Sequence, residues 1–216
     1  MSVKPDSIRE ILALAPVIPV LTINDARVAV PLALALREGG LPVLEVTLRT
    51  PAALRAIELI AAEVPDVVVG AGTVLDAGQF EAASKAGSRF VVSPGFSTEL
   101  AACARATGVP CLPGVVTASE IMSALAEGFD TLKFFPAAQA GGAPLLKAFS
   151  GPFANVRFCP TGGIDVGNAA DYLALANVAC VGMSSIAPPA LIDQGDFEAI
   201  TARARAAAAL PRAAVT

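Results

Sequence analysis

Short apolar runs rich in β-branched residues alternate with longer helical patterns along the whole chain of 216 residues. Several runs are continuously apolar, which is typical of strands that are covered on both faces in a parallel sheet. We predict eight such strands, at Val17–Leu21, Val43–Thr47, Val67–Ala71, Phe90–Ser93, Pro110–Pro113, Thr131–Phe134, Arg157–Pro160 and Ala179–Val181.

Helical patterns separate these runs, and one more precedes the first run. Two of them begin with capping pairs, because Thr117 stands three residues before Glu120 and Asp76 stands three residues before Gln79. We predict an opening helix at Ser7–Ala15, followed by helices at Asp25–Glu38, Ala52–Val64, Asp76–Ala86, Ser97–Thr107, Ser119–Glu127, Ala143–Phe149, Asn168–Ala176 and Phe197–Ala209.

The repeated strand–helix unit predicts an α/β fold, namely a single-domain (β/α)₈ TIM barrel with an extra N-terminal helix that spans residues 1–216. The alternative is an open doubly wound sheet, which normally carries a G-x-G-x-x-G turn after its first strand. The corresponding turn here reads LTINDA and contains no glycine. The sequence therefore favours the barrel.

Composition restricts the partners and the location of the protein. Hydrophobic residues make up 55% of the chain, but the longest charge-free stretch, 172–192, is interrupted by polar residues and two prolines, so no membrane span is predicted. Residues 1–10 lack the apolar core of a signal peptide, and we expect a cytoplasmic protein. The net charge is −4 without a basic cluster, which argues against a nucleic-acid partner.

The chain contains no histidine, so any acid–base chemistry must use a carboxylate, a lysine, a tyrosine, a cysteine or water. The four cysteines are scattered, without C-x-x-C spacing, and we expect them to be reduced and buried. We therefore expect no metal site and no cofactor.

Lys133 lies in the apolar run TLKFF, whereas Lys85 and Lys147 fall on predicted helices and Lys4 is close to the N-terminus. A charged lysine is costly to bury, so this position favours the neutral amine, which can attack a ketone. A lysine that snorkels or forms a structural ion pair is the alternative interpretation. Active sites of barrels lie at the carboxyl ends of the strands, where this lysine is expected.

Strand alternation places Glu45, Thr47 and Arg49 on one side of the run VLEVTLR. The second and sixth strands of an eight-stranded barrel are opposite each other, and inward residues of even-numbered strands share layers. Glu45 and Lys133 are therefore predicted to meet across the barrel axis. A structural Glu–Arg or Glu–Lys ion pair remains the alternative.

The segment CPTGGID places Gly162 and Gly163 after a predicted strand, and Ser184 follows the last strand. Glycines allow a backbone to approach an anion, and barrels often bind phosphate after strands seven and eight. We predict a phosphate site here, with an ordinary tight turn as the alternative. Thr73 is a helix cap, a substrate contact or both. Phe135 lies two positions after Lys133 and so points the same way, either as a wall of the pocket or as part of the barrel core.

The segments PVIPVL, GLPVLEVTLRT, VGAGTVL, SPGF, TLKFFPA and RFCPTGGID resemble the KDPG/KHG aldolases of the Entner–Doudoroff route, which are class I aldolases on a (β/α)₈ barrel, usually homotrimers. The resemblance runs from about Ile8 to Ala202. By motif match it assigns Lys133 as the Schiff-base lysine and Glu45 as the proton-shuttling glutamate. It also implies substrate contacts from Arg49, Thr73, Pro94, Phe135 and Thr161, and a phosphate end at Gly162, Gly163 and Ser184.

The resemblance implies cleavage of 2-dehydro-3-deoxy-6-phosphogluconate to pyruvate and glyceraldehyde 3-phosphate, and a second activity on 4-hydroxy-2-oxoglutarate, which gives pyruvate and glyoxylate. The partners expected are thus a 2-keto-4-hydroxy acid, pyruvate and further copies of the chain. The alternatives are a phosphate-binding isomerase or synthase barrel without covalent catalysis, and a ligand-binding barrel without activity. Neither requires the amine of Lys133.

The sequence departs from the family at two positions that we expect to affect the phosphate end. Val17 stands where some members carry an arginine as a phosphate contact, which predicts weaker phosphate recognition. Met183 stands where a glycine is common, and we expect it to narrow that end of the site.

Overall fold

The computed structural model describes residues 7–213, and the start of the N-terminal segment considered above lies outside them. The strands are β1 Val17–Leu21, β2 Val43–Thr47, β3 Val68–Gly72, β4 Val91–Val92, β5 Cys111–Leu112, β6 Gly114–Val115, β7 Thr131–Phe134, β8 Arg157–Pro160 and β9 Val181–Met183. The helices are α1 Ile8–Ala13, η1 Ala26–Val28, α2 Ala29–Glu38, α3 Ala53–Glu63, α4 Ala77–Lys85, α5 Thr98–Thr107, α6 Ala118–Ala126, α7 Gly142–Phe149, α8 Ala169–Leu173, α9 Pro189–Gln194 and α10 Phe197–Ala208.

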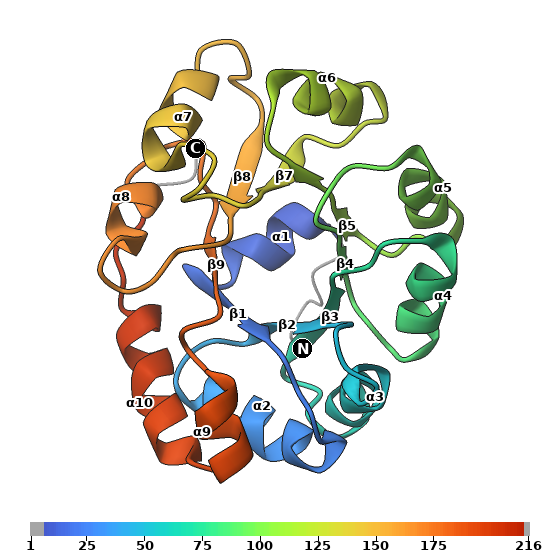
Figure 1. Ribbon diagram of the computed structural model, residues 1–216, viewed down its shortest axis with the longest axis vertical. Helices are drawn as coiled ribbons and strands as arrows, with labels where there is room; N and C mark the ends of the chain where they lie inside the picture. The colour runs from blue at the N-terminus through green and yellow to red at the C-terminus, as the bar shows by residue number, and fades with distance from the viewer. Residues whose placement is uncertain (1–6, 214–216) are drawn as a thin grey trace.

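All strand pairs of the described chain are parallel, and they form two sheets. One has six strands in the order β5-β4-β3-β2-β1-β9, and the other has three in the order β6-β7-β8. Isolated parallel bridges join Phe158 to Val178 and Thr161 to Gly182, so the end of the second sheet lies beside β9. Figure 1 shows the strands around the centre of the molecule, with the helices other than α1 outside them.

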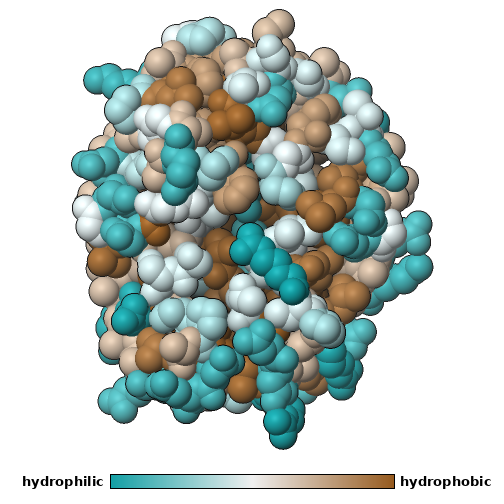
Figure 2. Space-filling model, viewed as in Figure 1, coloured by the Kyte–Doolittle hydropathy of each residue, from teal (hydrophilic) through white to brown (hydrophobic). Residues whose placement is uncertain are grey.

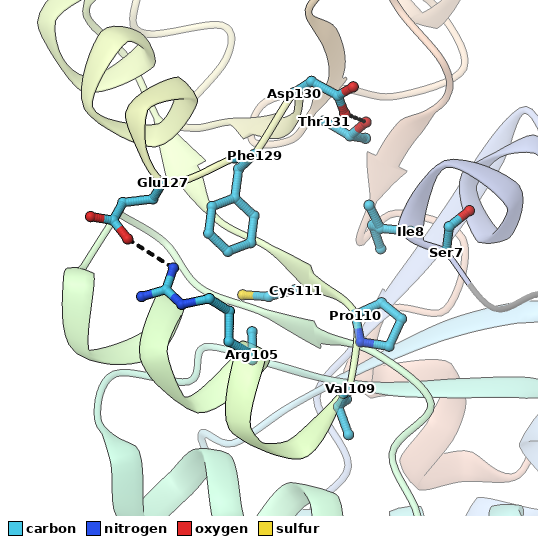
Figure 3. A pocket seen from close by; sticks show the side chains of 13 residues that line it. Ser7, Ile8, Arg105, Val109, Pro110, Cys111, Glu127, Phe129, Asp130 and Thr131 are labelled. Atoms are coloured by element: carbon cyan, nitrogen blue, oxygen red, sulfur yellow. Dashed lines mark hydrogen bonds and ion pairs between the residues drawn. The ribbon is translucent and has the colours of Figure 1, made fainter.

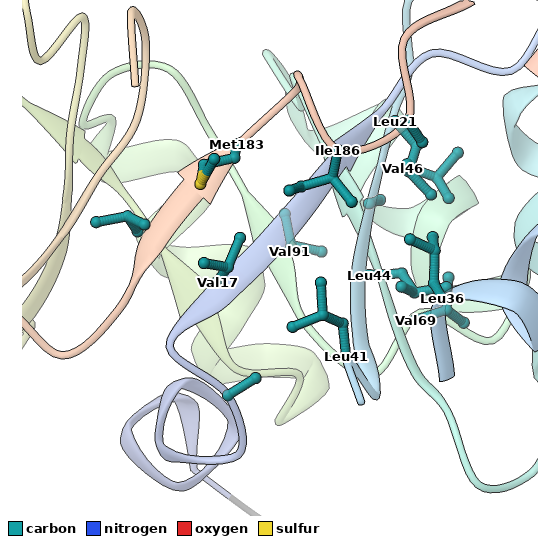
Figure 4. Close-up of a cluster of buried hydrophobic side chains, with 14 of the residues drawn as sticks. Val17, Leu21, Leu36, Leu41, Leu44, Val46, Val69, Val91, Met183 and Ile186 are labelled. Carbon is teal, nitrogen blue, oxygen red and sulfur yellow. The ribbon is translucent and has the colours of Figure 1, made fainter. Parts of the chain in front are cut away.

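Side chains alternate between two separate apolar layers, as strand geometry requires. Leu44 and Val46 of β2 belong to the larger cluster between strands and helices, part of which is drawn in Figure 4. Val43 and Ile18 belong to the smaller cluster, together with Ile11 and Leu12 of α1. The opening helix thus packs against the opposite faces of the strands, and in Figure 1 it lies across the centre of the ring.

Local capping explains several helix starts. The Thr117 side chain accepts from the Glu120 amide and Glu120 reaches back to Thr117, so the predicted capping box of α6 is confirmed. The Asp76 carboxylate accepts from the Gln79 amide at 2.8 Å, which confirms the predicted cap of α4. Gly108 ends α5 in the left-handed region at φ 70°, where glycine avoids the steric cost of a side chain.

The structure corrects two predicted strands and adds elements that were not predicted. The fifth predicted strand, 110–113, is shortened to β5, which pairs with β4, and a separate strand that was not predicted, β6, follows Pro113 and pairs with β7. The last strand is Val181–Met183 rather than Ala179–Val181, since its register is set by pairing with β1. The short helix α9 was not predicted, although it has proline at its first position and ends at Gly195 in the left-handed region.

No helix of residues 7–213 is both long enough and apolar enough to cross a bilayer. On the face shown in Figure 2, hydrophobic side chains form several small groups with hydrophilic side chains between them.

Candidate active site

Lys133 of β7 and Glu45 of β2 are in direct contact, although 88 positions separate them in the sequence. The Lys133 Nζ donates to Glu45 Oε1 at 3.2 Å, and the two side chains are only 6% and 5% exposed. The predicted meeting of these side chains is therefore confirmed. The contact holds the amine beside a proton acceptor.

Two glycines, which the sequence analysis did not identify, provide the space for this pair. A Cβ at Gly72 of β3 would overlap the Glu45 carboxylate, and a Cβ at Gly114, which pairs with Lys133 in register, would overlap the Pro94 carbonyl. A glycine inside a strand often marks such a close approach, so the signal was present in the sequence. Because these two glycines lack a side chain, Gly72 leaves room for the Glu45 carboxylate and Gly114 leaves room for the Pro94 carbonyl.

Arg49 and Thr73 form a second polar pair, at the carboxyl ends of β2 and β3. Arg49 Nε donates to Thr73 Oγ1 at 3.2 Å, and the arginine is exposed. Thr73 has φ 58°, a left-handed conformation that is uncommon for a residue with a Cβ. It does not cap α4, because Asp76 does so. The Thr73 hydroxyl instead orients the Arg49 guanidinium. The other N–H groups of Arg49 are then left to bind an anion.

Phe135 directly follows β7, the strand that contains Lys133, and Thr161 directly follows the neighbouring strand β8. The centroid of the Phe135 ring is 5.2 Å from Lys133 Nζ, and the residue is half-buried, so it lies beside the amine as its parity predicts. Thr161 follows β8, where Cys159 pairs with Lys133, and its hydroxyl donates to the Cys159 carbonyl at 3.5 Å. A Cβ at Gly182 would overlap the Thr161 hydroxyl.

The segments predicted to bind phosphate lie next to each other. The bridge between Thr161 and Gly182 joins the chain just before Gly162 to the chain just before Ser184. Gly162 and Gly163 have φ values of 102° and 70°, conformations that favour glycine, and Ser184 is exposed. This is the geometry of a turn that presents its backbone, although α8 begins only at Ala169.

The expected effects of Val17 and Met183 on the phosphate end are wrong. Both side chains are fully buried in the layer between strands and helices, and Figure 4 shows them on neighbouring strands within that cluster. Ile18 and Val20 alternate with Val17 along β1, so the side chains of these two residues point inward instead. Neither departure from the family therefore lies at the site.

A separate pocket of about 330 Å³ lies beyond the amino ends of β5 and β7, and Figure 3 shows its side chains. Phe129 and Cys111 line it, and the ion pair between Arg105 and Glu127, 2.8 Å long, closes one side. None of the residues predicted for catalysis or binding lines this pocket. No group of three or more His, Cys, Asp or Glu side chains within 7–213 is placed to hold a metal ion.

Burial raises the pKa of the Cys111 thiol from 9.0 to about 12, and the neighbouring Cys103 contributes to the same direction. The unfolded chain then loses this proton first, so the thiol's contribution to stability is complete below pH 9.0 and is lost as pH rises towards about 12. We expect the free energy of unfolding, measured by urea titration, to fall across this window by up to about 4 kcal/mol. Cys111→Ala should decline less steeply, and an equal decline in both proteins would contradict this assignment.

Parallel strands whose carboxyl ends hold a buried lysine against a glutamate, with an arginine–threonine pair alongside, define the site of a class I aldolase. The chain belongs to the KDPG and KHG aldolase family, whose model matches residues 8–203.

Curated relatives match over nearly the full length. The 2-dehydro-3-deoxy-phosphogluconate aldolase of Dickeya dadantii is 48% identical over 94% of this chain and 95% of its own. The KHG/KDPG aldolase of Escherichia coli K12 is 47% identical over 93% and 94% of the two chains.

Solved structures are similar to the same extent. The KDPG aldolase of Legionella pneumophila, with pyruvate captured as a covalent carbinolamine intermediate, is 48% identical, covers 93% of this chain and 98% of its own, and has a TM-score of 0.91. The aldolase of Zymomonas mobilis ZM4, solved with 3-phosphoglycerate, is 49% identical over 96% and 97% of the chains, with a TM-score of 0.90.

Proposed function

We propose that this chain is a class I aldolase that cleaves 2-dehydro-3-deoxy-6-phosphogluconate to pyruvate and glyceraldehyde 3-phosphate, with Lys133 as the nucleophile. The observation that carries the proposal is the 3.2 Å contact between the buried Lys133 amine and the Glu45 carboxylate. An isomerase without covalent catalysis or a ligand-binding barrel does not require a buried amine beside a base. Both substrates and products are anions, which suits a site with an arginine at its edge.

The Lys133 amine adds to the C2 ketone, and loss of water from the carbinolamine gives an iminium. Removal of the C4 hydroxyl proton then lets the C3–C4 bond break, and its electron pair enters the iminium. The products are the aldehyde and an enamine of pyruvate on Lys133. Protonation of C3 and hydrolysis release pyruvate and restore the amine.

Glu45 moves the protons in this sequence. Its carboxylate is in contact with Lys133 Nζ, so it can accept a proton while the amine attacks and return it to the departing hydroxyl. Directly or through a water molecule, it also takes the C4 hydroxyl proton.

The remaining predicted residues bind substrate. Arg49, oriented by Thr73, binds the carboxylate of the keto acid, and Thr161 donates a hydroxyl near the same end. Pro94 and Phe135 form the walls around the reacting carbon. The backbone of Gly162 and Gly163, with the Ser184 hydroxyl, binds the phosphate.

The same proposal extends to fold and assembly. We propose that the two sheets form one closed (β/α)₈ barrel, in which β5 and β6 are the halves of the fifth strand and α1 is the extra N-terminal helix. The proposal also includes a single domain, assembly into a homotrimer and a cytoplasmic location, as expected from the sequence. Activity on 4-hydroxy-2-oxoglutarate is a second candidate, favoured by the likeness to the KHG/KDPG aldolase of Escherichia coli.

Trapping with borohydride tests the covalent step. Incubation with pyruvate and sodium borohydride should reduce the iminium to a stable secondary amine on Lys133, found by mass spectrometry of the digested protein. The exposed Lys147 in the same digest is the internal control, and omission of pyruvate is the second control. An unmodified Lys133 peptide would refute the proposed mechanism.

A further inference from the structure

Arg203 of α10 makes a contact that the proposed chemistry does not use. Its Nη1 donates to the Ser185 carbonyl at 3.0 Å, across 18 positions of sequence. Ser185 directly follows Ser184, the residue assigned to the phosphate end. Among the ion pairs of residues 7–213, none involves Arg203, so this hydrogen bond is its specific partner interaction there.

Arg203 and Ser185 line a groove of about 710 Å³ between the segment after β8 and the helix α10. Asp165 and Gly167, from the segment that follows the two glycines, also line it. Asp165 is the acid that faces the groove, and its carboxylate accepts from the Gly167 amide at 2.8 Å. The arginine thus bonds one phosphate segment and lines the same groove as the continuation of the other.

The segment that Arg203 holds has little other regular structure. The strand β9 ends at Met183 and the next helix, α9, begins only at Pro189. A guanidinium bound to a carbonyl forms a charge-assisted hydrogen bond, which restrains the direction of that carbonyl more strongly than a neutral donor would. A carbonyl held in this way limits the backbone freedom of the adjacent residue, Ser184.

We infer that Arg203 is a positioning residue for the phosphate end of the substrate, acting through the Ser185 carbonyl. This inference rests on the proposed function, because it needs the phosphate to bind beside Ser184. A guanidinium that holds the segment in its binding conformation reduces the entropy lost when a substrate binds to that segment. Only substrates that extend to the segment gain from this. Arg203 therefore affects discrimination between phosphorylated and unphosphorylated substrates, and not the chemistry at Lys133.

The chain offers a matched control on the same helix. Arg205 carries the same charge, is exposed, and pairs at 3.8 Å with Glu38 of α2, away from the phosphate segments. Arg203→Ala and Arg205→Ala remove the same net charge, so a difference between them isolates the contact with Ser185. Arg203→Lys keeps a donor for the carbonyl and should recover part of the loss.

The test compares kcat/KM for 2-dehydro-3-deoxy-6-phosphogluconate and for the same compound without phosphate. Arg203→Ala should raise KM for the phosphorylated substrate about tenfold, the size of a lost charge-assisted hydrogen bond, with kcat kept. For the unphosphorylated compound, the KM of Arg203→Ala should stay within about twofold of the wild-type value. Inhibition by inorganic phosphate should weaken by the same factor, whereas Arg205→Ala should change none of these values.

Equal losses on both substrates, or the same losses in Arg205→Ala, would overturn the inference in favour of a structural or a general charge effect. Unchanged values in Arg203→Ala would overturn it as well. Borohydride trapping of pyruvate on Lys133 in the same variants reports on the proposed function separately. Normal trapping with no change in phosphate discrimination rejects only the role of Arg203, whereas failure to trap in the wild type rejects the aldolase proposal itself.

Discussion

Lys133→Ala should lower kcat/KM for 2-dehydro-3-deoxy-6-phosphogluconate by roughly 10⁵-fold or more, because it removes the nucleophile on which every covalent step depends. Cleavage is measured by coupling the release of pyruvate to its reduction by NADH. The fold should persist, since Lys133 belongs to neither apolar cluster of the described residues.

Two further variants serve as controls: one keeps a positive charge at position 133, and the other removes a lysine elsewhere. Lys133→Arg keeps a positive charge beside Glu45, but a guanidinium stays protonated and cannot attack a ketone, so it should be as inactive as the alanine variant. Lys147→Ala, on the exposed side of α7, should retain wild-type activity. Circular dichroism of each variant checks the fold. Cleavage at a rate near wild type by Lys133→Ala would exclude a Schiff base at this residue.

The position of this lysine illustrates what the sequence could predict. Parity along VLEVTLR and TLKFF, together with the expected barrel in which the second and sixth strands are opposite, brought Glu45 and Lys133 together. The same rule, applied to PVIPVL, would have placed Val17 on the outer face with Leu21. The resemblance to relatives led us instead to expect Val17 at the phosphate end.

Other features depend on tertiary pairing and are not encoded in a local pattern. The predicted strand 110–113 is shortened to β5 and followed by the separate strand β6, because β5 pairs with β4 whereas β6 pairs with β7. The need for glycine at 72 and 114 arises from the Glu45 carboxylate and the Pro94 carbonyl, which are distant in sequence. The contact between Arg203 and Ser185 likewise joins a helix and a loop that only the folded chain brings together.

Glu45→Gln should lower kcat by about 10²–10⁴-fold, the contribution typical of a positioned acid–base group. The amide keeps the size of the side chain and can still accept from the Lys133 amine, so substrate should bind almost as before. A chain without histidine offers no obvious substitute for this proton carrier. The loss should therefore appear in kcat, with KM within about threefold of wild type.

Exchange of the pyruvate methyl protons with deuterium, followed by NMR, tests the same residue without the aldehyde half of the substrate. This exchange requires only the iminium and enamine on Lys133 and a group that moves the C3 proton, so Glu45→Gln should slow it strongly. Glu38→Gln is the matched control, because Glu38 pairs with Arg205 on the surface of the molecule. If the Glu45–Lys133 contact were purely structural, Glu45→Gln would change the free energy of unfolding while exchange and kcat stayed at their wild-type values.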